Sequence, residues 1–212
     1  ALIRNPFITS YGLHTSALFG FANQVMKLIR SENPDYIVCA FDSKEKTFRH
    51  DMYEKYKANR PPMPQELQVQ LPHLWEMLEA MNLPVLKKPG VEADDIIGTL
   101  ALSANEKGLD TYIVSGDKDF MQLMNDHIFM YAPGTRKSPD PVIYDPKKVE
   151  EKWGVPPEKM IDLLGLMGDS SDNVPGVAGV GEKTAVKLIN AYGSLEGALA
   201  NADKVTNKRV HK

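Results

Sequence analysis

The sequence lacks several features that would define its compartment or its partners. It has a single cysteine, Cys39, among 212 residues, so neither a disulfide framework nor a thiolate zinc site can form. No apolar run approaches the roughly 20 residues that cross a bilayer, and the printed residues show no basic-then-apolar leader. A basic excess is missing too, since the net charge is −3. We expect a cytoplasmic protein with no membrane partner, which binds nucleic acid only if opposite charges are segregated.

The apolar pattern divides the chain near residues 140–145. Before this boundary, short apolar runs typical of buried strands alternate with stretches of helical periodicity. The expected strands cover residues 35–41, 83–88, 111–115 and 127–131. The expected helices between them cover residues 15–31, 64–81 and 92–107. The sequence therefore predicts an α/β domain with a central, mainly parallel sheet flanked by helices over residues 1–140, followed by a helical region over 141–212.

Carboxylates follow the ends of the expected strands. Asp42 comes directly after the first strand, and Asp117 and Asp119 follow the third. In open α/β sheets the ligand site lies beyond the carboxyl ends of the strands, so these side chains should meet at one edge. A helix start near residue 92 and a loop near residue 170 bring further carboxylates to that edge. These are Glu92, Asp94, Asp95, Asp169 and Asp172.

Such a cluster of carboxylates needs a cation, because neighbouring negative charges raise one another's pKa or recruit positive ions. Oxygen ligands suit Mg²⁺ or Mn²⁺, and no His/Cys set has zinc spacing. Two such ions about 4 Å apart can activate water and hold the leaving oxygen of a phosphodiester. The predicted metal ligands are Asp42, Glu92, Asp94, Asp95, Asp117, Asp119, Asp169 and Asp172.

Each acidic segment also has a purely structural explanation. Acidic residues at 92–95 would be ordinary partners of a helix dipole. Asp117 and Asp119 would simply cap a short helix, and the acidic loop near residue 170 would be a solvated turn. The convergence of separate segments on one edge favours the functional interpretation.

Residues 168–184 join the last carboxylates to a glycine-rich turn that opens into a helix. Glycines let a ligand approach the backbone closely, and the free N–H groups of a first helical turn attract phosphate. A Walker A loop does not fit, because Glu182 separates glycine from lysine, and a dinucleotide fingerprint would follow a strand. A helix–hairpin–helix over residues 168–192 fits better, with a ligand-free turn as the alternative. Its candidate DNA contacts are Gly176, Gly179, Gly181, Lys183 and Thr184.

Residues 44–62 mix basic and aromatic side chains directly after the first expected strand. This mixture suits a nucleic-acid strand, with charges on phosphates and rings on bases. An exposed amphipathic helix with a solvated face is the common alternative. The position beside the expected metal edge favours contact with nucleic acid. The candidate contacts are Arg49, Tyr56, Lys57 and Arg60.

Together these segments resemble the 5′-nuclease domain of bacterial DNA polymerase I and the related flap endonucleases, over nearly the whole chain. The matching blocks occur in the family's order at residues 38–42, 48–50, 56–60, 89–95, 115–119 and 168–184. The resemblance implies a PIN-like 5′-nuclease fold and a divalent-metal enzyme that cuts DNA near a 5′ end or at the base of a 5′ flap, in replication and repair. It also implies that the acidic residues hold the metals, some directly and some through water.

The resemblance implies roles for the basic segment and the hairpin as well. Lys57 and Arg60 match basic residues of a helical arch that meet the scissile phosphate, so we predict them to be catalytic. Tyr56 would stack on a base near the cut. Residues 176–184 match the hairpin that grips duplex DNA, in the family often with a K⁺ ion held by backbone carbonyls.

The family begins with a strand that ends in Asp-Gly and supplies a further metal ligand, and the printed sequence starts after that position. We expect a polymerase domain to follow in the intact protein, and a bacterial, nucleoid-associated monomer. Two other functions stay open. One is a non-catalytic module that grips branched DNA. The other is a Mg²⁺ phosphohydrolase for small molecules, which has no use for the hairpin. The leading hypothesis is phosphodiester hydrolysis by metal-activated water, with Lys57 and Arg60 neutralising developing charge.

Overall fold

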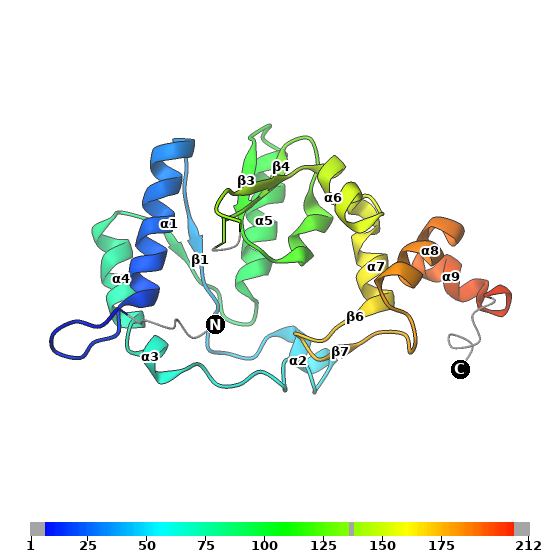
Figure 1. Ribbon diagram of the computed structural model, residues 1–212, viewed down its shortest axis with the longest axis horizontal. Helices are drawn as coiled ribbons and strands as arrows, with labels where there is room; N and C mark the ends of the chain where they lie inside the picture. Colours follow the sequence, from blue (N-terminus) through cyan, green and yellow to red (C-terminus); the bar gives the residue numbers. More distant parts are fainter. Residues whose placement is uncertain (1–6, 136–137, 206–212) are drawn as a thin grey trace.

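A pair of helices and a short two-stranded sheet form the first part of the fold in the computed structural model, which describes residues 7–135 and 138–205 (Figure 1). The helices are α1 (Ser16–Glu32) and α4 (Leu71–Ala80), and the parallel strands are β1 (Cys39–Ala40) and β2 (Val85–Leu86). α1 ends where Asn33 adopts the left-handed conformation, a common helix stop, just before a proline. Val25, Leu78 and Leu83 form the smaller of two hydrophobic cores here.

Between β1 and α3 the chain makes a long excursion that contains only α2 (Phe48–Met52), and Figure 1 shows it running to the hairpin formed by β6 and β7. α3 (Gln65–Gln68) and α4 correspond to the single helix predicted over 64–81 with a bend near Pro72. The break falls just before this proline, which occupies the first turn of α4, where no N–H partner is required.

The second part of the fold is built on a three-stranded sheet. Helix α5 (Ala93–Asn105) leads to β3 (Thr111–Val114), the 3₁₀ helix η1 (Lys118–Leu123), β4 (Ile128–Ala132) and β5 (Val142–Tyr144). β3 pairs with β4 in parallel, and β4 pairs with β5 in antiparallel fashion. β4 lies in the middle of this sheet, which explains its continuous apolar sequence.

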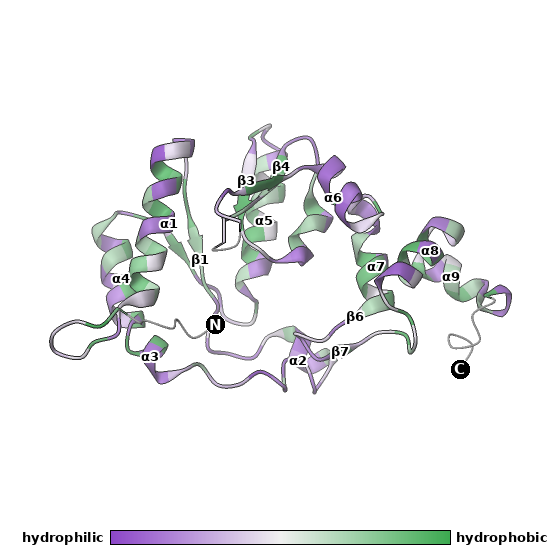
Figure 2. Cartoon of the chain, in the orientation of Figure 1, coloured by the Kyte–Doolittle hydropathy of each residue, from purple (hydrophilic) through white to green (hydrophobic). Residues whose placement is uncertain are grey.

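The rest of the described chain is mostly helical. It comprises α6 (Pro146–Trp153), η2 (Pro157–Lys159), α7 (Met160–Met167), β6 (Gly168–Asp169), β7 (Val174–Pro175), α8 (Glu182–Tyr192), α9 (Leu195–Ala200) and η3 (Ala202–Lys204). These helices share one large core with α5 and the three-stranded sheet, centred on residues such as Ile128, Met160 and Leu163. Figure 2 shows β4 and α7 as mostly hydrophobic, and the segment between α2 and α3 as mostly hydrophilic.

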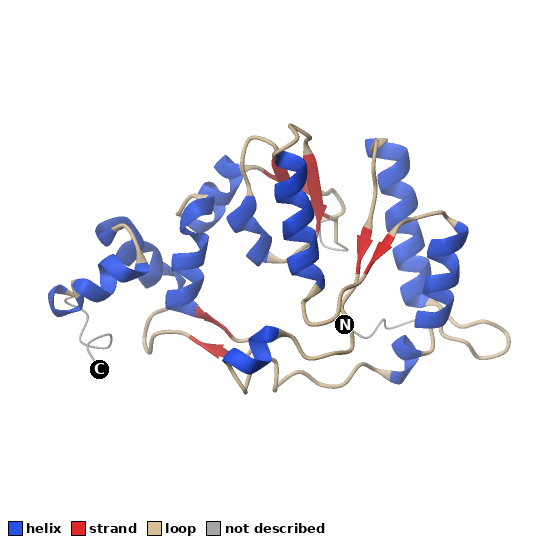
Figure 3. Cartoon of the chain, turned by 180° about the vertical axis from the view of Figure 1, so that it is seen from behind, coloured by secondary structure: helices blue, strands red, loops and turns tan. Residues whose placement is uncertain are grey.

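The predicted fold class is confirmed, but the single central sheet is a correction. Figure 3 shows the strands in separate groups, and within the described residues no strand joins β1 to β3. β1 and β2 are also shorter than predicted, and within the described residues each pairs on one edge only. β5, β6 and β7 were not predicted. No helix of the described part is long and apolar enough to cross a bilayer.

Candidate functional site

All the predicted carboxylates except that of Asp42 line one cleft of about 580 Å³. They come from the start of α5, from the connection between β3 and η1, and from residues 169–173, which we call the acidic turn. The opposite wall comes from α2 and from residues 53–60, which we call the strap. The basic and aromatic residues on this wall are Arg49, Tyr56, Lys57 and Arg60.

Local structure explains why these carboxylates are held in the cleft. Asp117 caps η1, where its Oδ1 accepts a hydrogen bond from the Asp119 N–H at 3.0 Å. Glu92 is the N-cap residue of α5, and its N–H donates to Asp95 Oδ2 at 2.9 Å. In the acidic turn, Asp169 Oδ1 accepts from the Ser171 N–H at 2.7 Å. The capping interpretation of Asp117 is therefore correct, and it is compatible with the functional one.

Asp42 follows β1, is exposed and is not among the residues that line the cleft. Its Oδ1 accepts a hydrogen bond from the Ala93 N–H at 2.8 Å, which places the carboxylate at the first turn of α5. Its negative charge is among those that act on Asp94. The structure thus brings Asp42 to the same edge as the other carboxylates.

Asp94 experiences this concentration of negative charge most strongly. Burial, followed by the charges of Asp117, Asp42 and Glu92, raises the pKa of Asp94 to about 6. Burial also raises the pKa of Asp119. A site that disfavours its own carboxylate charges in this way is suited to a cation, and oxygen donors suit Mg²⁺ or Mn²⁺.

The carboxylates line one cleft, but they do not surround a common metal position in this structure. Among residues 7–135 and 138–205, no three acidic, histidine or cysteine side chains are arranged to hold a metal ion as they stand. Basic side chains instead pair with the carboxylates. Lys57 Nζ lies 2.7 Å from Glu92 Oε1, and Lys118 pairs with Asp169. The donor chemistry fits a divalent cation, but binding one requires these pairs to rearrange.

Lys118 is a site residue that the sequence analysis did not single out. Burial alone would raise the pKa of Asp169, but the hydrogen bond from Lys118 and that from the Ser171 N–H outweigh it, so the pKa lies below its ordinary value. Lys118 Nζ also lies 3.3 Å from Asp119 Oδ1. The signal that could have found it is its place between Asp117 and Asp119.

Arg49 and Asp95 form a two-pronged ion pair that fixes the start of α5. Both Arg49–Asp95 contacts measure 2.8 Å, and Asp95 also accepts the N–H of Glu92. The hydrogen bond from Arg49 lowers the pKa of Asp95, and this pair raises the pKa of Arg49. The structure therefore places Arg49 on a carboxylate, and both oxygens of Asp95 already have partners.

Tyr56 points into the cleft and is only 7% exposed. Its hydroxyl lies 2.9 Å from Asp172 Oδ2 and 3.1 Å from Glu92 Oε2. Burial, then the hydrogen bond with Asp172, raises the pKa of Tyr56. Arg60 also pairs with Asp172. In this arrangement the ring of Tyr56 is enclosed, so the predicted stacking on a base requires the strap to move.

The predicted DNA-binding glycines form the turn between β7 and α8. Gly179 has a φ of 78°, in the left-handed region that favours glycine, and Gly181 is the N-cap residue of α8. Gly176 packs tightly on α7, since a Cβ there would lie 2.2 Å from the Met167 backbone. Lys183 and Thr184 occupy the first turn of α8. α7, the turn over residues 176–181 and α8 thus form a helix–hairpin–helix, in which Val180 is buried in the large core while Gly179 and Gly181 are exposed.

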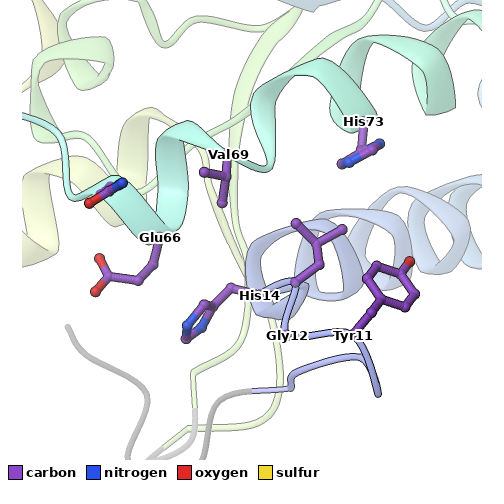
Figure 4. Close-up of a pocket in the computed structure, with 8 residues that line it drawn as sticks. Tyr11, Gly12, His14, Glu66, Val69 and His73 are labelled. Atoms are coloured by element: carbon purple, nitrogen blue, oxygen red, sulfur yellow. The ribbon is translucent and has the colours of Figure 1, made fainter.

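A second pocket, of about 540 Å³, lies between the N-terminal loop and helices α3 and α4 (Figure 4). His14 and Tyr11 contribute from the loop, and Glu66 and His73 from the helices. None of the predicted site residues lines it.

The fold combines a resolvase-like α/β domain bearing an acidic cleft with a helical region that carries a hairpin, and this defines a PIN-type nuclease fold. The family model described as "5′-3′ exonuclease, N-terminal resolvase-like domain" matches residues 1–154, and "5′-3′ exonuclease, C-terminal SAM fold" matches residues 155–212. The chain belongs to the 5′-3′ exonuclease family.

Relatives support this assignment over most of the chain. A 5′-3′ exonuclease of Aquifex aeolicus is 41% identical over 94% of this chain and 67% of its own. DNA polymerase I of Bacillus subtilis is 46% identical over 94% of this chain, which spans only 22% of that relative's length. Among solved structures, a bacteriophage T5 flap endonuclease, crystallised with DNA and metal ions, has a TM-score of 0.72 at 20% identity, covering 99% of this chain and 76% of its own.

Proposed function

We propose that this chain is a 5′-nuclease that hydrolyses DNA phosphodiester bonds near a 5′ end or at the base of a 5′ flap, with Mg²⁺ or Mn²⁺ as cofactor. The observation that carries the proposal is one cleft in which carboxylates from three segments face the basic side chains of the strap. The carboxylate wall can bind divalent cations, and the basic wall can bind the phosphate backbone of DNA. Together the two walls suit a metal-assisted attack on DNA.

Each wall of the cleft has its own task. A bound pair of divalent cations supplies activation of water and neutralisation of charge on the leaving oxygen. The carboxylates of Asp94, Asp117, Asp169 and their neighbours would hold these cations. Lys57 and Arg60 would neutralise charge that develops on the phosphate. The hairpin would hold duplex DNA through the backbone N–H groups at the start of α8, with K⁺ as a candidate ion there.

The intact protein is expected to act during DNA replication and repair, because its relatives include DNA polymerase I. We propose a monomer in the bacterial cytoplasm, with a polymerase domain as its covalent partner. We also propose that residues 1–140 form the nuclease core and residues 141–212 the DNA-binding region.

Replacing one carboxylate tests the assignment directly. Asp117→Asn keeps the size of the side chain but removes its charge, so cleavage of a 5′-flap substrate in Mg²⁺ should fall by about a thousandfold. Binding of the same DNA in Ca²⁺ should change by less than about threefold, because the strap and hairpin remain. Asp126→Asn is the matched control, since this exposed aspartate lies outside the cleft. Wild-type cleavage by Asp117→Asn would refute the proposed site.

A second candidate function is a non-catalytic module for branched DNA. The observation that favours it is that no three acidic side chains of the described chain converge on a metal position as they stand. Such a module would bind a 5′-flap substrate with the same affinity in EDTA and in Mg²⁺, and would release no product. Release of a 5′ fragment that depends on Mg²⁺ would exclude it.

A further inference from the structure

Hydrogen bonds tie the strap to the acidic turn along most of its length. The Lys57 N–H donates to the Asp172 carbonyl oxygen at 2.9 Å, and Asn59 Nδ2 donates to the Ser170 carbonyl oxygen at 2.8 Å. These residues are far apart in the sequence, so the contact joins two separate loops. The strap contains no helix or strand, whereas the acidic turn connects the paired strands β6 and β7. Hydrogen bonds to the acidic turn and ion pairs in the cleft therefore hold the strap in place.

The backbone conformation at both ends of this contact is unusual. Lys57 has a φ of 54° and Asn173 a φ of 59°, both in the left-handed region that side-chain-bearing residues seldom adopt. Asn173 Nδ2 donates to the Lys55 carbonyl oxygen at 2.7 Å. Residues persist in such conformations when their surroundings hold them, and these positions cluster at ligand clamps and switch regions.

The side chains that hold the strap down bind carboxylates that, in the proposed function, would bind the divalent cations. Lys57 Nζ lies 2.7 Å from Glu92 Oε1, Arg60 pairs with Asp172, and the Tyr56 hydroxyl contacts both carboxylates. Glu92 is only 8% exposed, so its charge needs a partner. An ammonium group at this distance and a divalent cation on the same carboxylate repel each other, so binding of one weakens binding of the other.

We propose that the strap and divalent cations compete for the carboxylates of Glu92 and Asp172. Cation binding releases Lys57 and Arg60 from these carboxylates, and the freed basic groups then face the phosphate of a DNA strand. Without the cation, the same basic groups neutralise the carboxylates and are withheld from DNA. The proposal rests on the proposed function, because it concerns the regulation of the same cleft.

Ca²⁺ binding, measured by calorimetry in the absence of DNA, tests the competition. Lys57→Met removes the competing ammonium group and should tighten Ca²⁺ binding about tenfold. Any loss of positive charge favours a cation, so Lys55→Met is the control. It makes the same charge change on the same strap, at an exposed side chain outside the cleft, and should tighten binding by no more than about twofold.

Hydrogen exchange of the Lys57 amide gives an independent readout, because it is measured on the unsubstituted protein and removes no charged side chain. Ca²⁺ should speed this exchange about tenfold, because the hydrogen bond to Asp172 opens when the strap is released. Asn59→Ala removes the uncharged contact with Ser170 and should speed the exchange without Ca²⁺. The side chain of Asn59 is exposed, so this variant should fold normally.

Three outcomes are informative. Tighter binding by Lys57→Met than by Lys55→Met, with faster Lys57 exchange in Ca²⁺, supports the proposal. Ca²⁺ binding with equal effects of both variants and unchanged exchange overturns the competition alone and leaves the nuclease function standing. No Ca²⁺ binding at millimolar concentration, together with no Mg²⁺-dependent cleavage, overturns both.

Discussion

Lys57 is held in place by both its side chain and its backbone. It lies against Glu92 in the cleft, its N–H is bound to the acidic turn, and its backbone is left-handed. Because its charge would lie beside the reacting phosphate once it is released, Lys57 is expected to matter for the transition state more than for binding.

Replacing this lysine should therefore affect the rate rather than the affinity. Lys57→Ala should lower the single-turnover rate of flap cleavage by about a hundredfold, because a positive charge near the developing phosphate charge is lost. The affinity for DNA in Ca²⁺ should change by less than about threefold. Lys55→Ala serves as the control. Equal losses of rate and affinity would mean that Lys57 only binds the DNA.

At this scale the sequence predicted where the carboxylates lie but not what they contact. Asp42, Asp117 and Asp119 could be placed because each follows a strand, and strand ends share an edge. The pairing of Lys57 with Glu92, or of Lys118 with Asp169, depends on distances between segments far apart in the chain. Periodicity and spacing carry no information on such distances.

Among the elements, the glycine-rich turn between β7 and α8 depends on glycine for its shape. Gly176 lies against the end of α7, while Gly181 has open space around its Cα. Both were predicted to contact DNA, yet the structure gives them different packing. Their alanine variants should therefore behave differently.

Gly176→Ala should reduce the free energy of unfolding by about 2–3 kcal/mol, because its Cβ would lie 2.2 Å from the Met167 backbone. Gly181→Ala is the matched control, since a Cβ there meets nothing within 4 Å and its φ is −99°. It should cost less than about 1 kcal/mol. Urea unfolding of both variants checks this. Equal destabilisation would show that the tight packing of Gly176 is unimportant.

Long helices and apolar strands were predicted well, and the short strands and the arch were not. The helices α1 and α5 and the strands β3 and β4 lie close to their predicted bounds. The predicted helical arch over residues 44–62 is a five-residue helix followed by turns, whose N–H groups bind carbonyls three residues earlier or, at Lys57, the acidic turn. β6 and β7 are two-residue strands, too short for any alternation to indicate them.

The described molecule contains two hydrophobic cores, and each holds one of the two tryptophans. Trp75 packs against the smaller core and Trp153 against the larger. The cores are separated in the sequence between residues 83 and 97. Single-tryptophan variants can therefore report on each core.

Leu78 and Leu163 are fully buried, one in each core, so Leu78→Ala and Leu163→Ala should each cost about 2–5 kcal/mol. In a Trp153→Phe background, Trp75 fluorescence should show the larger shift of the urea midpoint for Leu78→Ala. In a Trp75→Phe background, Trp153 should respond more to Leu163→Ala. Identical shifts at both tryptophans would show that the cores unfold as one unit.

The chain leaves the smaller core after β1 and returns to it at α3, and between them the strap rests on the acidic turn beside the larger core (Figure 1). Each ion pair beneath the strap is thus a non-covalent link between the parts of the chain that contain the two hydrophobic cores. Any ligand that takes over those carboxylates loosens this link and gives the two parts more freedom to hinge. Occupancy of a few oxygen atoms would then set how firmly the two cores are held to each other.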